Sequence, residues 1–416
     1  MVMVPHVSYP SVAISPSLIP PDASVAMTAP ERHASLSLAL IFALRMLGLF
    51  LVLPVFALEA AKLPGGDDPA RVGLAMGIYG LTQGMLQLPF GMASDRFGRK
   101  KVIVLGLLLF AAGSFLAASA DSLTGLLLGR AVQGAGAISA AVTALLADQT
   151  RDAVRTKAMA LVGGSIALVF SLSLVLAPAL TAHIGLAGLF ALTGALALVG
   201  VAVVLWGVPP EPLVHKNQPR GKLSNVLSHT GLMRLNFGVF VLHAVQLAMW
   251  MAVPALLVQA GLDKTHHWWV YLPAVLGSFV VMGGSLFPLE RRGYLRGVFL
   301  AAIGLIALVQ AGLLWVADAP HIPAMATLLF LFFCGFNVLE ASQPSLASRL
   351  APIAVRGSAL GVYNTLQSLG YFVGGLAGGA LLKWGGTHSL FVVCGLAMLA
   401  WFIVAWPMQV PTKVKA

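Results

Sequence analysis

Charge is the scarcest feature of this sequence. Only 9% of its 416 residues are charged, whereas soluble domains carry about 25%. Hydrophobic residues make up 59%, and acidic residues number only 14. Because a soluble surface cannot be built from so few charges, the composition excludes a soluble globular protein. It predicts a chain embedded in a lipid bilayer.

Cysteine and catalytic motifs are also scarce. The two cysteines, Cys334 and Cys394, lie inside apolar runs and are interpreted as small buried hydrophobes. The sequence contains no phosphate-binding loop, no metal-ligand cluster and no nucleophile motif. We therefore expect no enzymatic activity, no cofactor, no metal site and no ATP-driven step performed by this chain.

Apolar segments of membrane-spanning length, about 20 residues each, predict an all-α membrane protein with twelve transmembrane helices. Six precede and six follow a polar, proline-rich stretch. The predicted spans are 36–58, 72–93, 101–120, 122–147, 157–182, 186–208, 235–259, 268–289, 296–317, 321–346, 358–383 and 387–408.

These spans divide the chain into five parts. Residues 1–34, rich in Pro, Ser and Ala, are expected to form a disordered cytoplasmic tail. A six-helix bundle over 35–208 and a second over 235–408 are joined by a cytoplasmic linker at 209–234. Residues 409–416 form a short cytoplasmic tail in this interpretation.

Basic residues predict the orientation. The net charge of +11 could indicate nucleic-acid binding, but the bases lie in short loops between apolar runs, so no nucleic-acid partner is expected. With the N-terminus inside, 19 of the 25 Lys and Arg residues fall on the cytoplasmic side and four outside. The positive-inside rule then places both termini in the cytoplasm, in a multi-pass protein of the bacterial inner membrane.

An internal repeat supports two related halves. Shifting the chain by 201 residues places Val154-Arg155 on Val355-Arg356 and Leu189-Phe190 on Leu390-Phe391. Parallel repeats of this kind are typical of transporters that hold substrate at the interface between the halves.

A charged stretch between two apolar runs is the most distinctive local pattern. Residues 91–101 read Gly-Met-Ala-Ser-Asp-Arg-Phe-Gly-Arg-Lys-Lys. Gly91 and Gly98 predict a sharp bend with close backbone approach. Positive-inside topology explains the bases but not Asp95, so we interpret the stretch as a gate that docks on neighbouring helix ends.

This stretch closely resembles the signature loop between helices 2 and 3 of the major facilitator superfamily. Further segments resemble the YajR-type branch of its drug–proton antiporters: Arg45–Gly48, Gly77–Gln83, Gly129–Gly134, Arg155–Ala160, Leu235–Gly238 with His243, and Glu340–Ala341 with Pro344–Leu346. The branch usually carries a small soluble domain after the last helix, and we expect that domain to be absent because the chain stops at Ala416. Ala177 stands where the export motif of helix 5 has glycine, which weakens the export assignment.

The resemblance also implies how the gate works. Asp95 would dock on the N-terminus of the helix that begins near Gly357 when the cytoplasmic side is closed. Arg99 would then face Asp148, with Arg96 as a further base of the motif.

Ionisable groups inside a bilayer are expensive and usually functional. Glu340 is the single acid deep in a predicted span, so we interpret it as the proton carrier, with His243 second and Arg130 assisting. The alternative for each is a structural hydrogen-bonding role. Polar residues at helical spacing are expected to line a wet cavity that binds substrate: Arg45, Tyr79, Gln83, Gln87, Gln133, Gln246, Trp250, Asn337, Tyr363, Asn364 and Gln367.

The sequence therefore favours a proton-coupled secondary transporter that works by alternating access as a monomer in the lipid bilayer. Its partners would be protons and a small-molecule substrate, and export of apolar or amphipathic compounds would account for drug resistance. An importer or uniporter of a polar metabolite, and a transport-inactive membrane sensor, remain alternatives.

Overall fold

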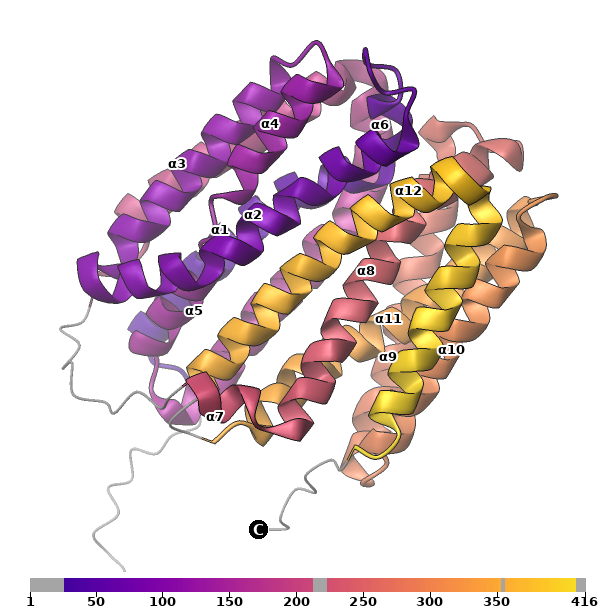
Figure 1. Ribbon diagram of the computed structural model, residues 1–416. Coiled ribbons are helices and arrows are strands. Elements are labelled where there is room, and N and C mark those ends of the chain that lie inside the picture. The colour runs from indigo at the N-terminus through magenta and orange to yellow at the C-terminus, as the bar shows by residue number, and fades with distance from the viewer. Residues whose placement is uncertain (1–25, 212–222, 353–355, 409–416) are drawn as a thin grey trace, which may run out of the picture.

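The computed structural model describes residues 26–211, 223–352 and 356–408, and within these ranges all regular structure is helical. Figure 1 shows two groups of helices side by side, one from each half of the chain. The elements are α1 (Ala29–Ala60), α2 (Pro69–Phe97), α3 (Arg99–Ala118), α4 (Leu123–Gly134), α5 (Ser139–Asp148), α6 (Asp152–Ala202), the π-helical turn η2 (Val203–Gly207), α7 (Leu223–Leu227), α8 (Thr230–Gln259), the 3₁₀ turn η3 (Lys264–His266), α9 (Trp268–Arg291), α10 (Leu295–Val316), α11 (Ile322–Leu350) and α12 (Arg356–Ala405).

The helices are enough for twelve membrane crossings. Within the described residues, nine helical segments are long and apolar enough to span a bilayer, and two of these are α6 and α12 with 51 and 50 residues. At 1.5 Å per residue each of these two is about twice the length a bilayer requires. Each is interrupted by one glycine with positive φ, so each forms two spans. Together with α2, this gives the predicted twelve-helix arrangement.

The interrupting glycines are Gly185 and Gly386, both with φ of 65°. They are 201 residues apart, the same shift that aligns the two halves of the sequence. Only glycine adopts this backbone conformation without steric cost. The chain therefore reverses direction at an equivalent glycine in each half. We call α1–α6 the N-terminal bundle and α8–α12 the C-terminal bundle.

The fourth span is broken rather than continuous. It consists of α4 and α5, separated by residues 135–138. At this break Gly136 lies against α3 so closely that a Cβ atom would stand 2.4 Å from the carbonyl oxygen of Gly106. The break therefore brings the backbone of this span into direct contact with α3.

The bundles pack against each other along α2 and the first half of α12, which run side by side in Figure 1. Glycines allow this contact: a Cβ on Gly73 would lie 2.2 Å from the carbonyl oxygen of Gly375, and one on Gly80 would lie 2.4 Å from that of Ser368.

Two predicted boundaries differ from the structure. Residues 29–34, expected in the disordered tail, form the first turns of α1, because Thr28 and Glu31 form a capping box. Residues 230–234, expected in the linker, belong to α8, which His229 caps. Residues 1–25, 212–222 and 409–416 of the expected tails and linker lie outside the described residues.

Candidate functional site

A carboxylate, a histidine and an amide meet inside the C-terminal bundle. His243 Nε2 lies 3.3 Å from Glu340 Oε2, and Gln367 Nε2 lies 2.8 Å from the same histidine nitrogen and 3.4 Å from Glu340 Oε1. The three residues come from α8, α11 and α12, so three helices converge here. We call Glu340, His243 and Gln367 the carboxylate cluster.

The histidine in this cluster is held from both sides. Its Nδ1 lies 2.8 Å from the carbonyl oxygen of Val239, one turn earlier in α8. This contact requires a proton on Nδ1, which leaves Nε2 of a neutral ring as an acceptor. The ring also packs edge-on against Tyr371, with centroids 4.9 Å apart. His243 therefore can accept one further proton, and it would do so beside a carboxylate.

Exposure differs sharply within the pair. The His243 side chain is 1% exposed, whereas the Glu340 side chain is 38% exposed although it lies in the interior of a 29-residue helix. The Glu340 side chain is therefore partly accessible, although its Oε2 atom, which faces His243, is buried. Phe336, one turn before Glu340, lies edge-on to His243 at 6.1 Å and places an apolar surface beside the same group.

Aromatic rings continue this surface across the bundle interface. Phe170 of α6 lies 6.0 Å from Phe333 and 6.4 Å from Phe336 of α11, and 5.0 Å from Phe50 of α1. These four rings join both bundles next to the carboxylate cluster. An apolar compound held between the bundles would contact them.

The N-terminal bundle buries two arginines. Arg45 is 1% exposed and donates to the Tyr79 hydroxyl at 2.8 Å and to Ser139 Oγ at 3.2 Å. Arg130 is 2% exposed and donates to Gln133 Oε1 at 2.6 Å and to the carbonyl oxygen of Met76 at 3.2 Å.

Tyr79 connects the two arginines. Its hydroxyl receives the bond from Arg45, while the Arg130 guanidinium lies 4.8 Å from the centre of its ring. Arg45 and Arg130 also approach the rings of Phe110 and Phe56, at 5.6 and 5.8 Å. Dipoles and ring faces thus stabilise both charges, and neither arginine forms an ion pair with an acid in the described part of the chain. We call Arg45, Tyr79, Arg130 and Gln133 the arginine cluster.

The other residues predicted to line a cavity are scattered over both bundles. Asn337 donates to Ser278 Oγ at 2.7 Å, Gln133 donates to Ser114 Oγ at 2.8 Å, and Asn364 accepts from Ser368 through its backbone carbonyl. Gln83 is half-buried. Four residues are at least 97% buried and keep at least one polar side-chain atom without a hydrogen bond in the described structure: Gln87, Gln246, Trp250 and Tyr363.

The charged stretch between α2 and α3 is more compact than predicted. Gly91 lies within α2, which continues to Phe97, so the predicted bend at Gly91 is wrong. The whole turn is the single residue Gly98, with φ of 104°, and α3 begins at Arg99. Because the chain reverses direction at this one residue, only one glycine is needed.

Arg99 organises the charges at this turn. Its guanidinium contacts Asp148 Oδ2 at 3.1 Å, Ser94 Oγ at 2.8 Å and the Asp95 carboxylate. The structure thus brings Arg99 and Asp148 together, whereas Arg96 points onto the ring of Phe97. We call the end of the molecule that carries these residues the basic end.

The predicted docking of Asp95 involves the start of α12. Gly357 is exposed there, and a Cβ on it would meet no atom within 4 Å. Residues 353–355, which immediately precede this helix, lie outside the described residues. The docking stays a prediction.

Glu211 is a residue at the basic end that sequence reasoning missed. Its two carboxylate oxygens accept from the backbone N–H groups of Arg99 and Lys100, at 3.0 and 2.6 Å. Gly98 has no side chain with which to cap α3, so Glu211 caps it from 111 residues away. Lys100 Nζ donates to the carbonyl oxygen of Val208, which fastens the same segment.

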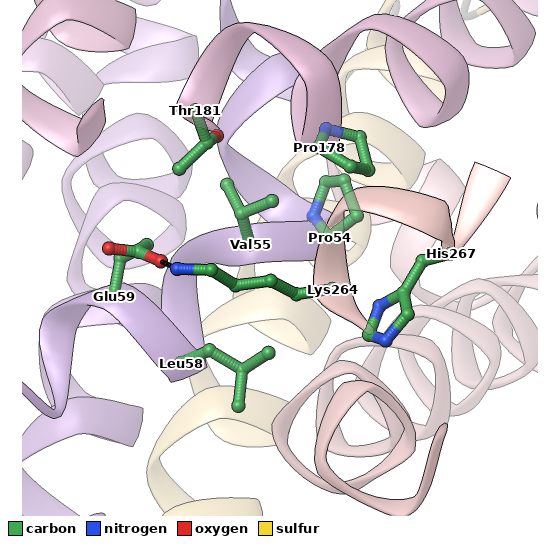
Figure 2. A pocket seen from close by; sticks show the side chains of 8 residues that line it. All are labelled: Pro54, Val55, Leu58, Glu59, Pro178, Thr181, Lys264 and His267. Atoms are coloured by element: carbon green, nitrogen blue, oxygen red, sulfur yellow. Dashed lines mark hydrogen bonds and ion pairs between the residues drawn. The ribbon is translucent and has the colours of Figure 1, made fainter. Parts of the chain in front are cut away.

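At the opposite end, which we call the far end, ion pairs join the two bundles. Lys264 Nζ lies 2.7 Å from Glu59 Oε1, as Figure 2 shows, and Lys383 Nζ lies 2.7 Å from Asp68 Oδ2. The hydrogen bond from Lys383 is the main cause that lowers the pKa of Asp68 below its ordinary value. Neither pair was predicted, because the partners are 205 and 315 residues apart.

A small cavity lies beside the first of these pairs (Figure 2). It offers about 10 Å³ to the centre of a water-sized sphere, roughly the space for one water molecule. Its walls come from both bundles: Pro54, Val55, Leu58, Glu59, Pro178, Thr181, Lys264 and His267.

Comparison with known proteins now identifies the family. The sequence model of the Major Facilitator Superfamily matches residues 38–375 and 289–416. This chain belongs to the major facilitator superfamily. Superfamily members are transporters rather than enzymes, so the chain is a multi-pass membrane transporter.

Individual relatives show which members of the superfamily this chain resembles. The inner membrane transport protein YajR of Escherichia coli K12 is 41% identical over 398 residues, which cover 94% of this chain and 86% of that protein. The multidrug resistance protein MdtH of Aeromonas hydrophila is 29% identical, covering 88% and 90%. Among solved structures, a mutant of the nucleoside transporter NupG superimposes with a TM-score of 0.72 over 90% of this chain and 99% of NupG, at 14% identity. This last likeness shows the superfamily fold alone.

Proposed function

We propose that this chain is a proton-coupled exporter of small apolar or amphipathic compounds, working by alternating access between its two bundles. The observation that carries the proposal is the carboxylate cluster, in which Glu340 lies 3.3 Å from His243 in the interior of a long apolar helix and its side chain stays partly accessible. The likeness to MdtH, a multidrug resistance protein, supports export and the substrate class.

Protonation of this cluster has a direct structural consequence. With Glu340 charged, its Oε1 accepts from Gln367 and its Oε2 faces the acceptor Nε2 of a neutral His243. A proton added to the carboxylate weakens the bond from Gln367 and allows a hydrogen bond from Glu340 to His243 Nε2, which changes how α11 is linked to α8 and α12. Coupling requires only that this change alters the balance between two conformations of the transporter.

The substrate would lie between the bundles, beside the rings of Phe50, Phe170, Phe333 and Phe336. These rings offer apolar contact without directional bonds, which suits compounds of varied shape. Competition for Glu340 between a proton and the bound compound would then couple export to proton entry.

The orientation is part of the proposal. The basic end faces the cytoplasm and the far end faces outward, so both termini are cytoplasmic in a monomer of the inner membrane. The gate residues Asp95, Arg99, Asp148 and Gly357 act at the cytoplasmic face. The pairs Glu59–Lys264 and Asp68–Lys383 close the outer face and separate when it opens.

Glu340→Gln in reconstituted vesicles tests the proposal, because glutamine keeps the shape and one acceptor of a protonated carboxyl. We expect the variant to bind and exchange substrate at symmetric pH but to lose uphill transport under a pH gradient. Asp318→Asn is the matched control, since that acid is 81% exposed at the far end. Near wild-type uphill transport by Glu340→Gln would exclude Glu340 as the coupling acid. Accumulation of substrate together with protons would indicate an importer.

A further inference from the structure

Among the buried polar atoms of the C-terminal bundle that make no hydrogen bond to any described residue, four belong to neighbouring side chains. They are Gln246 Oε1, Trp250 Nε1, Tyr271 OH and His267 Nε2. The exposed fractions of these residues are 2%, 3%, 0% and 1%. A buried polar atom without a partner is destabilising, so four such atoms in one region require a partner that the protein itself does not supply.

The four residues form one continuous row. Gln246 and Trp250 lie one turn apart on the same face of α8. The Trp250 ring meets that of Tyr271 edge-on at 5.4 Å, and the Tyr271 ring meets that of His267 at 5.8 Å. Each member therefore touches or neighbours the next, and the row passes from α8 to the start of α9.

Both ends of the row reach charged groups. At the inner end, Gln246 follows His243 by three residues on α8, and His243 contacts Glu340. At the outer end, His267 lines the far-end cavity together with Glu59 and Lys264, and Figure 2 shows its ring turned towards that space. The row thus connects the carboxylate cluster with the far end.

We propose that this row holds a file of ordered water that conducts protons between the far end and the carboxylate cluster. The inference rests on the proposed function, because it names the route by which protons would reach Glu340 from outside. One water joins two polar atoms through hydrogen bonds of about 2.8 Å each. Residues one helical turn apart have Cβ atoms about 5–6 Å apart, a spacing that single waters bridge.

The four atoms supply a mixed set of donors and acceptors. Gln246 Oε1 accepts, Trp250 Nε1 donates, and the Tyr271 hydroxyl does both. His267 Nε2 accepts or donates according to its tautomer. A proton entering at the His267 end is passed along the waters, and a different proton is delivered to His243 Nε2 or the Glu340 carboxylate. No group in the row needs to remain protonated.

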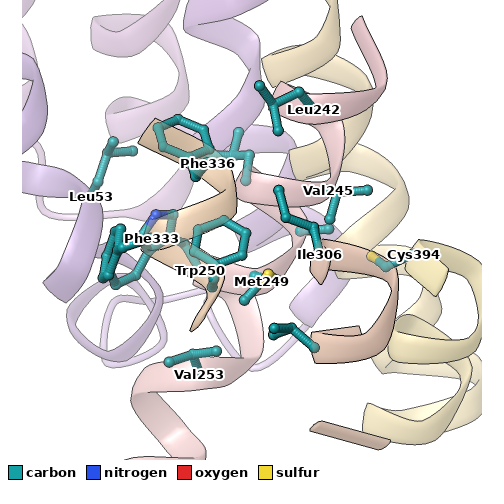
Figure 3. Close-up of a cluster of buried hydrophobic side chains, with 14 of the residues drawn as sticks. Leu53, Leu242, Val245, Met249, Trp250, Val253, Ile306, Phe333, Phe336 and Cys394 are labelled. Atoms are coloured by element: carbon teal, nitrogen blue, oxygen red, sulfur yellow. The ribbon is translucent and has the colours of Figure 1, made fainter. Parts of the chain in front are cut away.

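Apolar side chains pack around the middle of the row. Figure 3 shows Trp250 surrounded by apolar side chains, among them Phe333, Met249 and Val253. Such surroundings would keep a file of water narrow.

Hydroxyl-radical footprinting of the protein in lipid nanodiscs tests for the water directly. Radicals formed from bound water oxidise adjacent side chains even when bulk solvent cannot reach them. We expect oxidation of Trp250 and Tyr271 well above that of Phe299, which is equally buried in the same bundle but lies against Trp401, away from the row. Protection of Trp250 and Tyr271 equal to that of Phe299, after correction for intrinsic reactivity, would overturn the proposal.

Removal of a single oxygen tests whether the water conducts protons. Tyr271→Phe should slow proton-driven transport about tenfold, the factor that corresponds to the loss of one hydrogen bond. Substrate exchange at symmetric pH should stay unchanged. Trp401→Phe is the control, because its Nε1 is also buried and unpaired but its ring packs on Gly238, outside the row. Equal loss of driven transport and exchange would mean a structural role and would contradict the inference.

Together, footprinting and the transport assay distinguish an error in the proposed route from an error in the proposed function. If wild-type protein shows no proton-driven transport while Trp250 and Tyr271 are oxidised, the proposed function is wrong and the water site stands. If driven transport is present and Tyr271→Phe retains it fully, the route is wrong and the proposed function stands.

Discussion

The N-terminal bundle buries Arg45 and Arg130 without a carboxylate partner among the described residues, whereas the C-terminal bundle places Glu340 beside His243. Arginine keeps its proton in proteins, while a carboxylate and an imidazole exchange theirs readily. One bundle therefore carries fixed charge, and in the proposed function the other carries charge that changes. Two halves related by sequence have come to hold complementary electrostatic roles.

The difference also explains how each charge is stabilised. A fixed cation can be surrounded permanently by ring faces and dipoles, as Tyr79, Phe56 and Gln133 surround Arg130. A group that gains and loses a proton needs contact with water and a partner that tolerates both states. The partly accessible side chain of Glu340 and the amide of Gln367, which can donate or accept, would provide these.

The largest effect is expected from removing fixed charge. Arg130→Met keeps volume but leaves Gln133 Oε1 and the Met76 carbonyl without donors, and transport should fall about 100-fold, the effect of losing about 3 kcal/mol. Arg130→Lys should restore little, because lysine is a point charge without the planar fork. Initial rates in vesicles and elution as a monodisperse peak measure function and folding. Full activity of Arg130→Lys would contradict the importance of the planar contacts with Tyr79.

The next effect concerns the changeable charge. Gln367→Leu removes the amide that contacts both His243 and Glu340. We expect proton-driven transport to fall about tenfold, the loss of one to two hydrogen bonds, and its pH profile to shift. Gln343→Leu is the control, since this buried glutamine makes no side-chain hydrogen bond in the described structure. An unshifted pH profile would mean that Gln367 does not belong to the proton site.

A smaller effect is expected from removing the Tyr79 hydroxyl, through which Tyr79 links the two arginines. Tyr79→Phe removes the hydroxyl that accepts from Arg45 but leaves the ring beneath Arg130. Stability should fall by about 1–3 kcal/mol, because a buried donor loses its acceptor, while the pH profile of transport stays unchanged. Thermal unfolding in detergent and transport rates measure the two. A shifted profile would show that the N-terminal bundle also takes part in proton exchange.

The smallest effect is expected at the far end, outside both clusters. The pKa of Asp68 is lowered by Lys383, so their pair contributes above the ordinary pKa of aspartate and is lost as pH falls through the lowered value. At neutral pH, Asp68→Asn should widen the far end slightly. In wild-type protein the far end should widen only in strong acid, where Asp68 becomes protonated. Spin-label distances between α2 and α12 measure this. An identical distance in the variant and wild type would show that the pair does not hold the far end closed.

The sequence predicted the helices because apolar length and loop charge are local signals. It also predicted the repeat, Glu340 as the deep acid, and Arg99 facing Asp148. It did not predict that Tyr79 joins Arg45 to Arg130, or that Lys383 meets Asp68, since those contacts depend on how distant helices pack. The bend assigned to Gly91 was wrong because glycine also serves helix packing, and nothing local distinguishes the two uses. His243 and Glu340 were named separately, and only the fold shows that they touch.

The cap that Glu211 places on α3 has a consequence for dividing the protein into two co-expressed pieces. A cut after Glu211 leaves the N-terminal piece with the carboxylate that completes its own third span. A cut a few residues earlier gives that carboxylate to the other piece, and α3 starts with two unpaired N–H groups. The natural boundary between the halves therefore lies beyond Glu211, whereas composition alone starts the linker at residue 209.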